Sequence, residues 1–157
     1  ASANRKVQAD AFLGTELGDG KFYKSTAGTT GAFTEQTIVF DSTEYNNLTR
    51  GTFNTSTGEY TVGSDGARIL VTSQYRITAG DPGQTIHTEI EKNGVAQVHG
   101  GITTVFDGYG AVGIGSSVTT TINCAAGDVI RVRSHARHDD SYSTGASATF
   151  VCIVELG

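Results

Sequence analysis

The chain consists of short runs in which apolar and polar residues alternate. Glycine-containing turns, such as Leu17-Gly18-Asp19-Gly20, separate these runs. No stretch keeps the i, i+3, i+4 and i+7 apolar spacing of a helix. Many short strands with frequent turns predict a sandwich or barrel. Strands are expected at Thr37–Phe40, Gly51–Asn54, Gly58–Val62, Ala67–Thr78, Gln84–Lys92, Val95–His99, Ser117–Cys124, Asp128–Ser134 and Ala146–Leu156.

Two local patterns sharpen this prediction. In the segment Ala67–Thr78, Ile69, Val71 and Tyr75 fall on one face and mostly polar residues on the other, which is typical of a strand with one buried side. Asn93-Gly94 lies between two strand-like runs, and both residues tolerate positive φ, so the pair predicts a tight hairpin.

The last predicted strand is apolar on both sides. One side carries Phe150, Cys152, Val154 and Leu156, and the other carries Val151 and Ile153. A strand with two apolar faces must be covered twice, and a two-sheet sandwich covers one of them. A loop or another subunit must cover the second face; we favour a subunit, because exposed apolar patches usually mark association. Core and interface positions are therefore expected at Phe150, Val151, Ile153 and Val154.

Composition supports an all-β domain and excludes several functions. The 157 residues include 21 Gly and many Thr and Ser, but one Pro, no Met and no Trp. This length suits a single domain over residues 1–157, with residues 1–10 as an extended arm or stalk connection. The net charge of −5 argues against nucleic-acid binding. No apolar run approaches the about 20 residues of a membrane span.

The two cysteines, Cys124 and Cys152, both fall in predicted strands. In a secreted domain they would often form a disulfide, whereas a reducing compartment would keep them apart. Free thiols are favoured, because Cys commonly serves as a small buried apolar residue. Neither has a second Cys or a His at ligand spacing, so a metal site there is less favoured.

Several short motifs, taken in order, resemble those of the C1q/TNF-like domain family. Lys92-Asn93-Gly94 matches the hairpin of that family, and Ala126-Gly127-Asp128-Val129 matches the element before its penultimate strand. The remaining matches are Ala11-Phe12, Val39-Phe40-Asp41, Tyr45-Asn46, Phe53-Asn54, Thr57-Gly58-Glu59-Tyr60-Thr61, Asp65-Gly66 and Phe150–Val154.

The resemblance implies an antiparallel two-sheet jelly-roll sandwich of about ten strands that trimerises around a threefold axis. It also makes calcium plausible near the trimer apex, with no ligands assigned. The chain departs from the family pattern at Ala67-Arg68-Ile69, where an aromatic residue is usual, and in the glycine-rich stretch Phe106–Ser116. Richness in Gly, Thr and Ser without Met or Trp suits a virion fibre or decoration head better than an animal serum protein.

Motifs for catalysis are weak. Asp139-Asp140 are adjacent and predict a solvated loop rather than two carboxyls held across a scissile bond. The run Gly108–Gly115 lacks a following Lys-Ser/Thr, so it is interpreted as a surface loop and not as a phosphate loop. His135 and His138 with the two aspartates offer a less favoured metal site. We therefore expect no enzyme activity.

The strongest charged feature is a stripe in which Arg131, Arg133, His135 and Arg137 share one strand face. Arginine forks there could bind a sugar carboxylate or a phosphate. The favoured alternative is a solvated face paired with Asp139, Asp140 or acidic residues of a neighbouring strand.

Three tyrosines, Tyr45, Tyr109 and Tyr142, fall in predicted loops. An exposed Tyr provides a rigid platform for a sugar ring or a protein partner, or else its ring folds back onto the sandwich. Tyr109 is the preferred candidate, followed by Tyr142.

The sequence thus predicts a non-enzymatic, trimeric head of a virion fibre or decoration protein that binds a host receptor or glycan. Its partners would be two further copies of the chain and other virion or surface-fibre proteins, at a virion or extracellular surface. A purely structural decoration or cement protein, and a secreted C1q-like recognition protein, are the alternatives.

Overall fold

The computed structural model describes residues 18–80, 82–105 and 112–156, which form twelve β-strands and no helix. None of these residues belongs to a helix that could cross a membrane. The strands are β1 (Asp19–Tyr23), β2 (Glu35–Thr37), β3 (Ser42–Asn46), β4 (Gly51–Asn54), β5 (Glu59–Val62), β6 (Ala67–Gly80), β7 (Thr85–Lys92), β8 (Val95–His99), β9 (Thr103–Thr104), β10 (Val112–Cys124), β11 (Val129–Ala136) and β12 (Phe150–Glu155).

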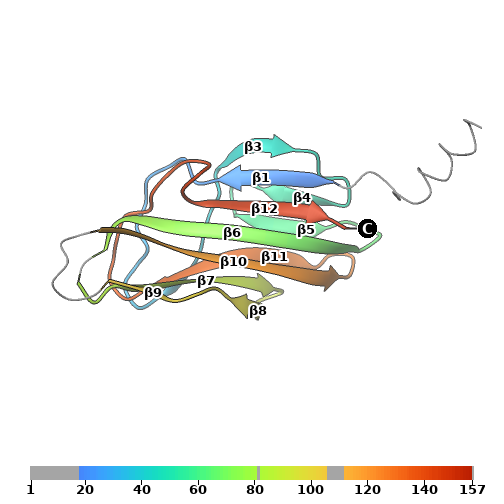
Figure 1. The fold of residues 1–157 in the computed structure, drawn as a ribbon. Helices are drawn as coiled ribbons and strands as arrows, with labels where there is room; N and C mark the ends of the chain where they lie inside the picture. Colours follow the sequence, from blue (N-terminus) through green and yellow to red (C-terminus); the bar gives the residue numbers. More distant parts are fainter. Residues whose placement is uncertain (1–17, 81, 106–111, 157) are drawn as a thin grey trace, which may run out of the picture.

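The strands form two antiparallel sheets packed face to face (Figure 1). Sheet A has the order β10-β6-β12-β1-β3, and sheet B has the order β4-β5-β11-β7-β8. The short strands β2 and β9 pair with β11 and β7 at the margins of sheet B. The predicted all-β, two-sheet antiparallel sandwich is confirmed.

The core lies between the two sheets. On sheet A, Phe22 and Ile69 are buried together with Val151 and Ile153 of β12, while Phe53 and the rest of sheet B face them. The rings of Phe22 and Phe53 stack across the sandwich with centroids 3.9 Å apart. Val151 and Ile153 thus belong to the core, as expected for one side of the last strand.

The glycines near the start of the described chain were misread as a turn. Residues Asp19–Tyr23 form β1, which lies between β12 and β3 in sheet A. A Cβ on Gly18 would lie 1.9 Å from the Glu155 carboxylate, and one on Gly20 would lie 2.8 Å from the Phe22 ring. These glycines permit close packing instead of chain reversal.

The glycine-rich stretch before Ser116 was also misread. From Val112 onward it belongs to β10, a strand of 13 residues paired along its length with β6. Gly113 and Gly115 are exposed on this strand; Gly115 is the register partner of Arg76, whereas Gly113 lies at a register shift between Val112 and Ile114. The preceding residues 106–111, which include Tyr109, lie outside the described residues, as do Ala11-Phe12.

The remaining predicted strands are present, but β3 and the short β9 were not expected from the sequence, and two boundaries differ. Ile38 and Phe40 are buried, but they follow β2 instead of forming a strand. The last strand begins at Phe150, because the residues from Gly145 onward form a turn. The predicted hairpin is confirmed, with φ of 52° at Asn93 and 77° at Gly94.

The two ends of the described chain lie at one end of the sandwich. In Figure 1, β1 begins and β12 ends at the right, and Asp19 is the register partner of Val154. The ends of β6 and β9 and the start of β10 lie at the left. One end of the sandwich therefore holds both ends of the described chain, at β1 and β12, and the ends of β6 and β9 and the start of β10 lie at the other.

Candidate functional site

The cationic stripe lies on the outer face of sheet B. Arg131, Arg133 and His135 alternate with buried residues of β11, so their side chains share one face as predicted. Arg137 follows the strand, and its Nη1 donates to the carbonyl oxygen of Gly83 at 3.3 Å.

Two of these arginines form ion pairs with carboxylates from neighbouring strands. Arg131 Nη2 lies 2.8 Å from Glu59 Oε1, while Arg133 lies 2.6 Å from Glu91 Oε1 and 2.9 Å from Glu35 Oε2. The hydrogen bond that Arg133 donates to the Glu91 carboxylate raises the pKa of Arg133. Of the two readings of the stripe, this arrangement matches the acid-paired face, with glutamates and not Asp139 or Asp140 as the partners.

A row of three histidines continues the same face. The rings of His87 and His135 stack with centroids 4.7 Å apart, and His99 meets His87 edge-on at 6.0 Å. His99 Nδ1 lies 2.9 Å from Glu89 Oε2. Burial, followed by the charges of the two neighbouring histidines, lowers the pKa of His87. The neutral imidazole is therefore favoured at the centre of the row.

The metal site considered from the sequence is not formed. His135 belongs to the histidine row, whereas Asp139 accepts a hydrogen bond from the backbone N–H of Gly31. Among the described residues, no three His, Cys, Asp or Glu side chains are arranged to hold a metal ion. His135, His138, Asp139 and Asp140 therefore do not form a cluster of ligands.

The tyrosines differ from their expected positions. Tyr142 is buried, meets Tyr75 edge-on at 5.5 Å and hydrogen-bonds Ser134 at 2.7 Å, so the prediction of an exposed platform is wrong for this residue. Its ring folds back onto the core because that burial removes a large apolar surface from water. Tyr45 lies on β3 and not in a loop, with 40% of its surface exposed.

The outer face of sheet A carries an apolar band. Phe150, Cys152 and Val154 alternate along β12 with core residues, and all three are half-buried. Val154 is the register partner of Leu70 on β6, which is also half-buried. Leu156, just beyond β12, is 39% exposed. Of the four positions assigned to core and interface, Phe150 and Val154 thus face outward.

The two thiols are free. Cys124 packs against the core, whereas Cys152 faces outward with Phe150 and Val154. The two side chains lie on opposite faces of sheet A, which prevents a disulfide within the chain. The prediction of free thiols is confirmed, although both are only half-buried.

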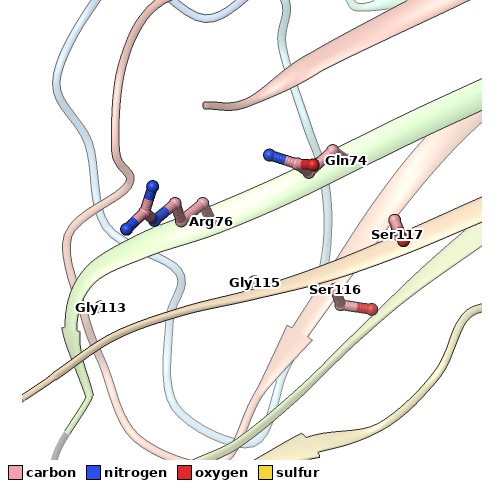
Figure 2. A pocket seen from close by; sticks show the side chains of 6 residues that line it. All are labelled: Gln74, Arg76, Gly113, Gly115, Ser116 and Ser117. Carbon is pink, nitrogen blue, oxygen red and sulfur yellow. The ribbon is translucent and has the colours of Figure 1, made fainter. Parts of the chain in front are cut away.

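A hollow of about 290 Å³ opens on the outer face of sheet A, toward the end away from the termini. Figure 2 shows Gln74 and Arg76 on β6 beside Gly115 and Ser117 on β10. The hollow exists because Gly113 and Gly115 project no side chains there; a Cβ on Gly113 would lie 3.4 Å from Arg76 Nη2. The sequence pattern did not predict this site, because the two glycines are typical of a loop.

Hydrogen bonds fix the walls of the hollow. Gln74 Nε2 donates to the carbonyl oxygens of Ser147 and Ala148, at 3.3 and 3.0 Å. The backbone N–H of Arg76 donates to Thr149 Oγ1 at 3.3 Å. The turn before β12 therefore holds this part of β6, and the exposed Arg76 side chain lies along the hollow beside Gly113 and Gly115.

A buried carboxylate joins the two sheets at the opposite end. Glu155 accepts hydrogen bonds from the backbone N–H groups of Thr49 and Arg50 and from the Tyr60 hydroxyl, the last at 2.7 Å. Burial alone would raise its pKa, but these hydrogen bonds hold the pKa of Glu155 below its ordinary value. Both carboxylate oxygens of Glu155 accept hydrogen bonds from the protein, so this side chain connects β12 to β5 and has a structural role.

Known structures identify this architecture. The structure of Eiger TNF from S. frugiperda aligns with a TM-score of 0.67 and 15% identity, over 90% of this chain and 93% of that chain. Murine APRIL at pH 5.0 aligns with a TM-score of 0.69 and 12% identity, over 90% of this chain and all of that chain. The chain has a TNF-like jelly-roll fold. No protein-family model and no curated protein sequence matches it.

Proposed function

We propose that this TNF-like domain is a non-enzymatic recognition module that works as a homotrimer, with the apolar band on β12 and β6, on the outer face of sheet A, as the subunit interface. The observation that carries the proposal is the band formed by Phe150, Cys152, Val154 and Leu70 on that face. An outward sheet face is polar when water covers it, so an apolar band at the centre of this sheet favours contact with protein.

Two further copies of the chain are the proposed cover. TNF-like folds at 90% coverage of this chain support it, as does the resemblance of its motifs to a family of trimers. The band lies on β12 and β6, in the middle of sheet A, where a neighbouring copy can cover it without disturbing either edge strand.

The mass in solution, measured by light scattering and sedimentation, tests the interface. The unmodified chain is expected to be a trimer. Val154→Glu places a charge in the band and is expected to give monomers, because a carboxylate buried without a partner is costly. Thr61→Glu is the matched control: it places the same charge on an exposed position of sheet B and should leave the trimer intact. An unmodified monomer contradicts the proposal.

The proposed role is attachment to a host-surface receptor or glycan as the head of a virion fibre or decoration protein. Three identical sites on one rigid trimer gain avidity without new contacts. The support for a virion is compositional: 21 Gly, abundant Thr and Ser, no Met and no Trp.

Binding to a glycan array and to host cells tests the attachment role. The trimer is expected to bind, and the Val154→Glu monomer to bind more weakly through lost avidity. A trimer that binds neither glycans nor cells would instead indicate a purely structural decoration protein. Immunogold labelling of particles and filaments tests the location, and labelling confined to the cell interior would contradict it.

A further inference from the structure

We infer that the hollow between β6 and β10 binds an anionic sugar unit, with Arg76 as the group that holds its negative charge. The inference rests on the proposed recognition role and adds a site and a ligand class to it.

Charge distinguishes Arg76 from the arginines of sheet B. Arg131 and Arg133 on sheet B are neutralised by glutamates, but within the described ranges no carboxylate lies in ion-pair distance of Arg76. The Arg76 side chain is exposed and lies in a hollow that holds no acidic side chain. A guanidinium presents a planar fork of donors that fits a carboxylate or a sulfate group.

The size and shape of the hollow suit a ligand larger than an ion. The hollow measures about 290 Å³, far more than the about 30 Å³ that one water molecule occupies. A bare ion would leave most of this space to solvent, whereas a six-membered sugar ring with its substituents would use it. Gly113 and Gly115 add no side chain to the floor of the hollow, and the Arg76 side chain lies beside both, within 4 Å of where a Cβ would stand, so a ring that approaches the floor meets the guanidinium.

The polar groups that line the hollow suit a sugar. Because the Gln74 amide nitrogen is engaged by two backbone carbonyls, its side-chain oxygen is held in place as an acceptor. Ser117 adds an exposed hydroxyl from β10. One cation, one fixed acceptor and one hydroxyl suit a ligand with a single negative charge and several hydroxyl groups.

The position of the hollow keeps it away from β1. Its residues on β6 and β10 lie toward the end of the sandwich opposite the start of β1, so a stalk attached near β1 would leave the hollow accessible (Figures 1 and 2). Gln74 is the register partner of Phe150, which places the hollow beside the proposed interface. In a trimer, three copies would lie around one axis and could bind one branched or repeating glycan.

Titration of the full chain with single sugars, followed by amide NMR shifts, tests the inference. The probes are N-acetylneuraminic acid and N-acetylglucosamine 6-sulfate, with N-acetylglucosamine as the neutral comparison. At least one anionic sugar is expected to shift the amides around Gln74 and Ser117, and the neutral sugar is not. The two anionic probes distinguish a carboxylate source of the charge from a sulfate source.

Three variants complete the test. Arg76→Gln is expected to weaken binding by about tenfold or more, since it removes a charge-assisted hydrogen bond. Gly115→Ala is expected to weaken binding by filling the hollow, because its Cβ would meet its nearest neighbours at an ordinary 3.4 Å. Arg68→Gln removes the same charge from an exposed position at the other end of β6 and should bind as the unmodified chain does.

The inference is overturned if neither anionic sugar binds, if Arg76→Gln binds as tightly as the unmodified chain, or if the neutral sugar binds equally well. The mass of each sample separates this result from the proposed function. A trimer that binds no anionic sugar would contradict the sugar site and support the proposed trimer. A monomer that binds the anionic sugar would support the sugar site and contradict the proposed trimer.

Discussion

Two tyrosines with the same burial have opposite hydrogen-bonding states. Tyr60 and Tyr75 are both fully buried in the core. The Tyr60 hydroxyl donates to Glu155, whereas the Tyr75 hydroxyl has no hydrogen-bond partner among the described residues. An unpaired buried hydroxyl costs free energy that a paired one recovers. The two positions therefore offer a matched test of what a single buried hydroxyl contributes.

Replacing each tyrosine with phenylalanine is expected to move stability in different directions. Tyr60→Phe should lower the free energy of unfolding by about 1–3 kcal/mol, because it removes a hydrogen bond to a buried carboxylate. Tyr75→Phe should leave that free energy within about 1 kcal/mol of the unmodified chain or raise it. Urea unfolding at neutral pH measures both. Equal losses in the two variants would contradict this account of the Tyr60–Glu155 bond.

At this scale the sequence predicts which residues share a face better than it predicts what each residue touches. The face shared by Arg131, Arg133 and His135 follows from strand periodicity alone. Their partners Glu35 and Glu91 come from other strands, so only the pairing of β2 and β7 with β11 reveals them. The burial of Tyr142 depends likewise on distant packing and has no local sequence signal.

Individual strands show where local pattern succeeds and where it fails. β8 and β6 were predicted well because alternation and the Asn93-Gly94 turn are local signals. β1 and the first part of β10 were missed because glycine marks both turns and close approaches. The functional candidate beside Arg76 depends on that second use of glycine, so it could not be found without the sheet.

The histidine row on β7, β11 and β8 is expected to make stability depend on pH. The pKa of His87 is lowered in the folded chain, so the unfolded chain binds its proton first as pH falls. The contribution of neutral His87 to the free energy of unfolding is complete above the ordinary histidine pKa of about 6.5. It is lost as the pH falls from there through the lower pKa that His87 has in the folded chain. His135 and His99 face this ring, and Glu35 partly offsets their effect.

Replacing His87 should reduce this pH dependence. His87→Thr, a good strand former, is expected to lose less stability than the unmodified chain between pH 7.5 and pH 5.5. His138→Gln removes a histidine outside the row and serves as the control. Thermal unfolding at several pH values gives the measurement. An unchanged pH dependence in His87→Thr would show that the row does not control stability in this range.

For the whole molecule, the proposed trimer has a consequence for unfolding. When three folded chains separate as they unfold, mass action makes the melting temperature rise with protein concentration. The unmodified chain is therefore expected to melt at higher temperature as its concentration increases. Val154→Glu should melt at a temperature independent of concentration, and Thr61→Glu should follow the unmodified chain. A concentration-independent midpoint for the unmodified chain would count against a coupled assembly.

The adjacency of β1 and β12 has a topological consequence. Since Asp19 and Val154 are register partners, the two ends of the described chain are separated by about one strand spacing of 4.8 Å. A short linker could join them, and new ends could be opened between Asn93 and Gly94, where the hairpin tip is exposed and a Cβ on Gly94 would touch nothing. Such a circular permutant would keep every strand whole and move the tethering point to the β7–β8 hairpin.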